Sequence, residues 1–174
     1  MKGRAEGVFS FPNPVNELAA RTVAFVVLLM CICAIAFDEP WLLVPITYGF
    51  WARVLTGPSL SPLGQLATRV VAPRLGPARP VAGPPKRFAQ AMGAAMSSLA
   101  VVLWFGFGEH TATWVVVALI VVAAALESLA GYCLGCKVFG LLMKAGVIPE
   151  KVCLECADLS LRRPDLVANR RAAS

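Results

Sequence analysis

Six cysteines lie in this chain, and four of them form two pairs with a spacing typical of reactive or metal-binding thiols. The first pair is Cys133 and Cys136, in the sequence CLGC, and the second is Cys153 and Cys156, in CLEC. The sixteen residues between the pairs fit the C-x2-C-x15-20-C-x2-C pattern of four-thiolate zinc sites. The same spacing suits thiol–disulfide exchange, because the second thiol of a pair can resolve a mixed disulfide formed by the first. Three interpretations therefore stay open: a redox or sulfur-transfer relay, a structural metal site, and unpaired thiols that have no shared role.

The other two cysteines, Cys31 and Cys33, lie inside a long apolar run. On a helix, side chains two residues apart point about 200° away from each other, so these thiols cannot readily bridge. A free cysteine packs as a small apolar side chain, and we expect packing roles for both.

The composition indicates a membrane protein. Of the 174 residues, 58% are hydrophobic and 15% are charged, and the mean hydropathy is +0.72. These values exclude intrinsic disorder and argue against a soluble monomer, because so short a chain cannot bury that much apolar surface in one core. The sequence contains no P-loop, G-x-G-x-x-G, H-E-x-x-H or G-x-S-x-G motif, so conventional kinase, dehydrogenase and hydrolase functions have no supporting residues.

The apolar runs predict an all-α membrane protein, a four-transmembrane-helix bundle with spans at about 18–37, 41–55, 90–107 and 111–130. The second span is the shortest, since its residues rise only about 22 Å, and Pro45 interrupts it. It crosses the membrane only if Arg53 extends its charge to the interface. Residues 1–148 form the transmembrane domain in this prediction. Residues 149–174 form a cytoplasmic tail with a short helix that begins near Pro149.

The basic residues predict the orientation. The segment between the second and third spans carries five Lys or Arg residues and no acidic residue, whereas the two short connections carry no Lys or Arg. Positive loops stay in the cytoplasm, so both termini face inside, in the cytoplasmic membrane of a bacterium. The net charge of +6 then reflects topology and attraction to anionic lipid headgroups, and we expect no nucleic-acid partner. Within the same segment, residues 63–71 could form an amphipathic stretch on the membrane surface.

This orientation places both cysteine pairs in a reducing compartment, which disfavours permanent disulfides. Lys137 and Lys151 lie near the pairs and would favour thiolates.

A few charged residues lie in or near the predicted spans. Glu17 and Arg21 are four residues apart, and we expect an interfacial salt bridge between them rather than a polar cavity. Glu127 is the only acidic residue well inside a span, which makes it a functional candidate. It would otherwise pair with Arg53 or Lys137, which lie at a similar depth.

Four stretches together resemble the small bacterial membrane proteins catalogued as domain of unknown function 4395. They are NPVNELAAR (13–21), WLLVPITYGFWARVLTGPSLSPLG (41–64), PPKRFAQ (84–90) and GYCLGC (131–136). The resemblance covers about residues 13–143, and it singles out Asn16, Glu17, Arg21, Arg53, Pro58, Cys133 and Cys136. It implies an association with thioredoxin-like or rhodanese-like sulfurtransferase proteins. If the second cysteine pair lies outside the family's pattern, the dithiol is favoured over a four-cysteine metal site.

The leading hypothesis is therefore a cytoplasm-facing membrane thiol protein. Cys133 and Cys136 would exchange disulfide or sulfane sulfur with a soluble partner, and Cys153 and Cys156 would act as a second relay pair. One alternative is a non-enzymatic membrane protein whose four cysteines hold a structural zinc ion. Another is a small transporter or channel-like homo-oligomer, with Glu17, Arg21, Arg53 and Glu127 lining a polar path.

Overall fold

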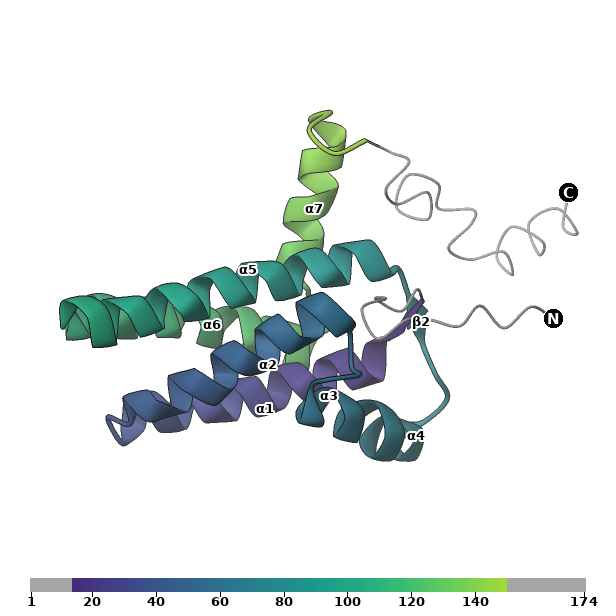
Figure 1. Cartoon of the computed structure of the whole chain (residues 1–174). Helices are drawn as coiled ribbons and strands as arrows, with labels where there is room; N and C mark the ends of the chain where they lie inside the picture. Colours follow the sequence, from purple (N-terminus) through teal and green to yellow (C-terminus); the bar gives the residue numbers. More distant parts are fainter. Residues whose placement is uncertain (1–13, 150–174) are drawn as a thin grey trace, which may run out of the picture.

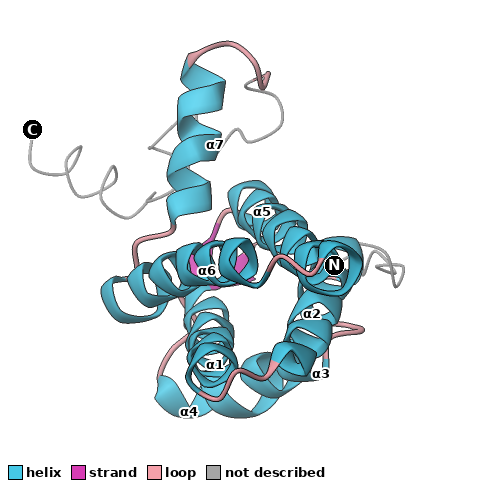
Figure 2. Cartoon of the chain, turned by 90° about the vertical axis from the view of Figure 1, so that its left-hand side faces the viewer, coloured by secondary structure: helices cyan, strands magenta, loops and turns pink. Residues whose placement is uncertain are grey.

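Four long helices run side by side and form a bundle in the computed structural model, which describes residues 14–149 (Figures 1 and 2). They are α1 (Glu17–Ala36), α2 (Leu43–Thr56), α5 (Gly83–Val101) and α6 (His110–Ala130). Helix α1 packs on α6, and α5 packs on both α2 and α6. The predicted all-helical architecture is confirmed for this part of the chain.

Within the described residues, three helices are long and apolar enough to cross a membrane. They are α1, α6, and α5 together with its π-helical continuation η3 (Val102–Phe107). Helix α2 follows a short 3₁₀ turn, η1 (Pro40–Leu42), and its 14 residues rise only about 21 Å, against a lipid core of about 30 Å. A fourth crossing therefore stays a prediction. Pro45 does not interrupt α2, because it lies in the first turn, where a backbone N–H has no partner inside the helix.

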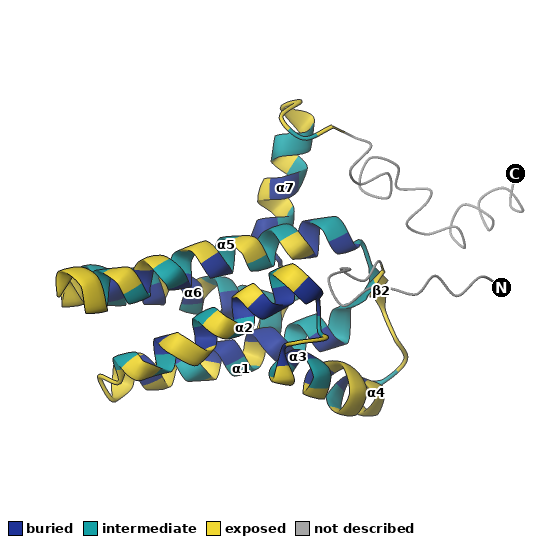
Figure 3. Ribbon diagram, viewed as in Figure 1, coloured by how far each residue is buried: buried dark blue, intermediate teal, exposed yellow. Residues whose placement is uncertain are grey.

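The core of the bundle consists of small and medium-sized apolar side chains, such as Ala19, Val27 and Val117. Cys31 is fully buried among them, whereas Cys33 is exposed, so the two thiols point apart as predicted. Large apolar side chains such as Phe25 and Leu29 are exposed on the outer faces (Figure 3). An apolar exterior of this kind is consistent with contact with lipid.

The connection between α2 and α5 is a packed helical segment rather than a surface linker. It consists of α3 (Pro62–Leu66), the π-helical η2 (Ala67–Val71) and α4 (Ala72–Leu75). Ser61 caps α3 by accepting the backbone N–H of Gly64 at 3.1 Å. Ala67 and Ala72 are fully buried, and all three pieces contact α1.

A two-residue antiparallel clasp joins the beginning of the described chain to the end of this connection. Strand β1 (Val15–Asn16) pairs with β2 (Pro80–Val81). The backbone N–H of Glu17 then donates to the carbonyl of Arg79 at 2.8 Å. The clasp therefore fixes the beginning of α1 beside the beginning of α5.

Helix α7 (Leu134–Lys144) leaves the bundle and projects away from it at the end where the clasp and α4 also lie (Figure 1). Gly131, in the left-handed region with φ 66°, ends α6 and redirects the chain. Gly146, with φ 75°, follows the end of α7. The predicted helix after Pro149, with Cys153 and Cys156, lies outside the described residues.

Candidate functional site

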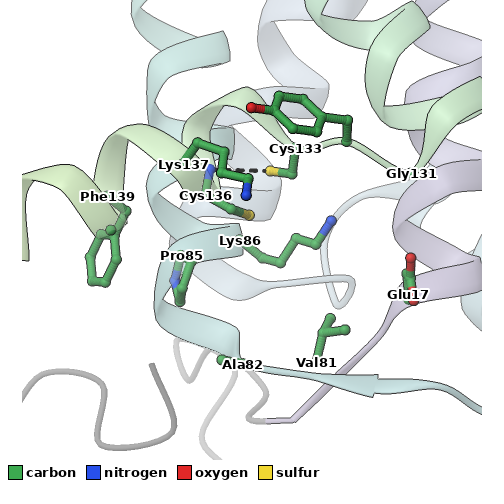
Figure 4. A pocket seen from close by; sticks show the side chains of 12 residues that line it. Glu17, Val81, Ala82, Pro85, Lys86, Gly131, Cys133, Cys136, Lys137 and Phe139 are labelled. Carbon is green, nitrogen blue, oxygen red and sulfur yellow. Dashed lines mark hydrogen bonds between the residues drawn. The ribbon is translucent and has the colours of Figure 1, made fainter. Parts of the chain in front are cut away.

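The first cysteine pair lies at the beginning of α7. Cys133 is the residue that caps the helix, and its Sγ accepts the backbone N–H of Cys136 at 3.3 Å (Figure 4). This is the contact that a serine or aspartate oxygen makes at other helix beginnings. A thiolate in this position is stabilised both by the N–H group and by the positive end of the helix dipole.

The two thiols of the pair differ in acidity. The hydrogen bond from the Cys136 thiol lowers the pKa of Cys133, and nearby Lys86 lowers it further, against the opposing effects of burial and Glu127. The same hydrogen bond, together with burial, raises the pKa of Cys136. Cys133 is therefore the thiol that ionises first, and Cys136 keeps its proton. That division suits a nucleophile and a resolving thiol.

Both cysteines line a pocket of about 440 Å³ between the bundle and α7 (Figure 4). Lys86 from the first turns of α5 and Glu17 from the beginning of α1 also line it. Lys137 lines it too, and its ammonium nitrogen lies 5.3 Å from the centre of the Tyr132 ring. The dithiol thus lies in a concave site with charged walls.

Gly135, inside the C-x-x-C sequence, is required for close packing. A Cβ atom at this position would lie 2.5 Å from both the Cα and the Cβ of Ala89 in α5. Only a glycine allows α7 to begin this close to α5. The residue type between the two cysteines therefore holds the dithiol against the bundle.

An ion pair joins α5 and α6 next to the pocket. The Lys86 ammonium lies 2.6 Å from a carboxylate oxygen of Glu127, and both side chains are largely buried. The prediction that Glu127 pairs with Arg53 or Lys137 is wrong. Helix α5 begins at Gly83, seven residues before the predicted span, and so brings Lys86 into the bundle. Sequence reasoning missed Lys86 as a site residue, although it belongs to the PPKRFAQ stretch, whose prolines mark a helix beginning.

Arg21 binds the end of α6 rather than Glu17. Its guanidinium donates to the carbonyl of Ser128 at 3.1 and 3.2 Å and to that of Leu129 at 3.0 Å. No ion pair within 4 Å joins Glu17 and Arg21 in the described structure, so the predicted salt bridge is wrong. The cation instead satisfies carbonyls that have no partner inside the helix. Asn16 caps α1 by accepting the N–H of Leu18 at 3.1 Å.

Arg53 lies inside the bundle, where other parts of the chain bury it. It is only 6% exposed. Its Nε donates to Gln90 Oε1 at 2.9 Å, and its Nη1 donates to Ser61 Oγ at 3.3 Å. The packed α3 segment and α5 therefore cover Arg53, and the depth of its charge in a membrane stays a prediction.

The structure thus gathers Glu17, Lys86, Cys133 and Cys136 around one pocket, whereas Arg21 and Arg53 contact other parts of the chain. Within residues 14–149, no group of three or more His, Cys, Asp or Glu side chains is arranged to hold a metal ion. The four-cysteine zinc site needs Cys153 and Cys156, which lie outside these residues, so that hypothesis is not tested.

Comparisons with known proteins agree with the sequence resemblance. A search of curated proteins and a search of solved structures each found no match to the chain. The family described as domain of unknown function (DUF4395) matches residues 15–144, a range that contains every described helix and the first cysteine pair. The chain therefore belongs to the family described as domain of unknown function (DUF4395).

Proposed function

We propose that this chain is a membrane thiol–disulfide exchange protein that acts through Cys133 and Cys136 on a soluble thioredoxin-like or rhodanese-like partner. The observation that carries the proposal is the placement of Cys133 as the cap of α7, with Cys136 donating to it. A bacterial cytoplasmic membrane, four spans and cytoplasmic termini complete the proposal. In that arrangement, the pocket opens into a reducing compartment, which keeps the Cys133–Cys136 pair in the dithiol form that the exchange requires.

The exchange begins with the Cys133 thiolate. It attacks one sulfur of a partner disulfide, an intermolecular S–S bond forms, and the partner's other sulfur leaves as a thiolate. Cys136 then attacks Cys133 Sγ, which releases the partner's second sulfur and forms the Cys133–Cys136 disulfide. The proton of Cys136 passes to a released partner thiolate. The partner disulfide gains two electrons, and this dithiol loses them.

The same nucleophile can accept sulfane sulfur. The Cys133 thiolate attacks the terminal sulfur of a partner persulfide, a persulfide forms on Cys133, and the partner leaves as a thiolate.

Cys153 and Cys156 form a second relay pair in this proposal. They would reduce the Cys133–Cys136 disulfide by a further exchange.

Trapping the mixed disulfide tests the proposal. The full chain is purified in detergent and mixed with an oxidised thioredoxin-like protein. Cys136→Ser is expected to accumulate a covalent adduct on Cys133, because no resolving thiol remains, whereas Cys133→Ser forms none at this site. Cys33→Ser serves as the matched control, since it makes the same change on an exposed thiol outside the pocket.

Metal and free thiols are measured on the same sample. Metal-free protein with a reversible Cys133–Cys136 disulfide supports the exchange function. About one zinc ion per chain with four protected thiols refutes it and establishes the structural metal site.

A further inference from the structure

A second pocket, of about 250 Å³, lies on the other side of Lys86 from the cysteines' helix. Its walls come from the beginning of α1, the end of α2, the α3–η2 segment and the first turns of α5. The only charged side chains among its described lining residues are two cations, Arg53 and Lys86. Both are buried, at 6% and 8% exposure.

The hydrogen bonds of Arg53 are incomplete. A guanidinium has five N–H donors, and in this protein Nε binds Gln90 and Nη1 binds Ser61. Nη2 is buried and has no hydrogen-bond acceptor among the described residues. A buried donor normally has a partner, so this nitrogen marks a place where an acceptor would be stabilised.

The charges around the pocket are also unbalanced. Glu127 is the one described carboxylate that acts electrostatically on both Arg53 and Lys86, and it is already in the 2.6 Å pair with Lys86. Two buried cations therefore share one carboxylate. Arg53 lies in the last turn of α2, whose dipole offsets only part of the excess positive charge. A buried charge that lacks a counter-charge favours the binding of an anion.

We propose that this pocket binds a tetrahedral oxyanion of the phosphate or sulfate class, with the Arg53 guanidinium as a donor group and Lys86 as a second positive charge. Guanidinium groups present N–H donors in a geometry that matches such oxyanions. The volume equals that of about eight water molecules, which is enough for an ion or for the phosphate of an ester. The remaining walls include apolar residues such as Ala19, Val23 and Pro58, which suit the apolar part of an ester. The oxyanion can thus be a free ion or the phosphate of a lipid headgroup.

The first experiment uses the wild-type chain. It is purified in a zwitterionic detergent and a chloride buffer, and inorganic phosphate is titrated in while heat and thermal unfolding are measured. Saturable binding is expected, together with a rise in the unfolding midpoint. Potassium chloride at the same ionic strength is expected to give neither. Absence of saturable phosphate binding, or an equal effect of chloride, overturns the proposal.

Substitutions then assign the site. Arg53→Lys keeps the charge but removes the forked donor, and it is expected to weaken phosphate binding at least about tenfold, the loss of one charge-assisted hydrogen bond. Arg69→Gln is the matched control, because it removes an exposed cation from the neighbouring η2 segment. Unchanged binding in Arg53→Lys, or an equal loss in Arg69→Gln, assigns the anion elsewhere and overturns the proposal.

Nanodiscs distinguish the two sources of the oxyanion. If a lipid headgroup occupies the pocket, phosphatidylcholine competes with inorganic phosphate and lowers its apparent affinity, relative to digalactosyl diacylglycerol, a neutral lipid without phosphate. If the pocket takes a free ion, the affinity is the same in both. Either result supports the oxyanion site when Arg53→Lys weakens phosphate binding at least about tenfold.

Discussion

Replacing Gly135 by alanine tests whether close packing of α7 on α5 holds the dithiol in place. The added Cβ would lie 2.5 Å from two carbon atoms of Ala89, whereas carbon atoms in contact are normally about 3.5–4.0 Å apart. The overlap is therefore roughly 1 Å or more. One contacting atom is backbone, so the clash cannot be relieved by rotating a side chain. Overpacking of this kind costs about 1–3 kcal/mol.

Gly140 offers a control on the same helix. A Cβ there would have no atom within 4 Å, so Gly140→Ala introduces no clash. Both substitutions raise helix propensity by up to about 1 kcal/mol, and this gain largely cancels when the variants are compared. We expect Gly135→Ala to be about 1–3 kcal/mol less stable than Gly140→Ala.

The assay combines thermal unfolding in detergent with the alkylation rate of Cys133. In Gly135→Ala, α7 moves away from α5, so burial and Glu127, which raise the pKa of Cys133, lose more influence than Lys86, which lowers it; Cys133 is therefore expected to react faster at neutral pH. Gly140→Ala is expected to react at the wild-type rate. Equal stability and equal alkylation rates in the two variants would refute the packing argument.

The remaining predictions concern the ion pair and one other close contact. Lys86→Met removes a charge that lowers the pKa of Cys133, so the alkylation rate measured against pH is expected to shift to higher pH. Glu127→Gln removes a charge that raises this pKa, so it should shift the profile to lower pH; shifts in the same direction would contradict the electrostatic account. Gly93→Ala would place a Cβ 2.3 Å from the Phe50 ring and is expected to destabilise the fold by about 1–3 kcal/mol in chemical unfolding. Phe50→Leu in the same chain should recover part of that loss, and a purely additive double variant would argue against the contact.

Apolar runs in the sequence are enough to predict where the long helices α1 and α6 begin and end. The predicted spans at 18–37 and 111–130 differ by one residue at most from α1 and α6 at either end. The beginning of α5 could not be predicted in this way, because its first turns are polar and apolar scanning starts only at Gln90. The helix begins at Gly83, where two prolines supply the backbone angle that a first turn requires.

The sequence predicts which cysteines form the site, but it does not predict which side chains pair with each other around them. The C-x-x-C spacing identifies Cys133 and Cys136, because that pattern is local in sequence. The Lys86–Glu127 pair spans 41 residues and depends on the rotation of α5 against α6, which no local pattern specifies. The burial of Arg53 likewise depends on how the α3 segment folds back onto α1.

Lys86 lines both pockets, and this shared wall couples them thermodynamically. An oxyanion beside Lys86 and a thiolate on Cys133 would both be stabilised by the positive charge of the same ammonium group. If the proposed anion binds, it must therefore reduce the acidity of Cys133, and by reciprocity ionisation of Cys133 must weaken anion binding by the same factor. The position of one lysine would then make the reactivity of the dithiol depend on the concentration of an anion that never contacts sulfur.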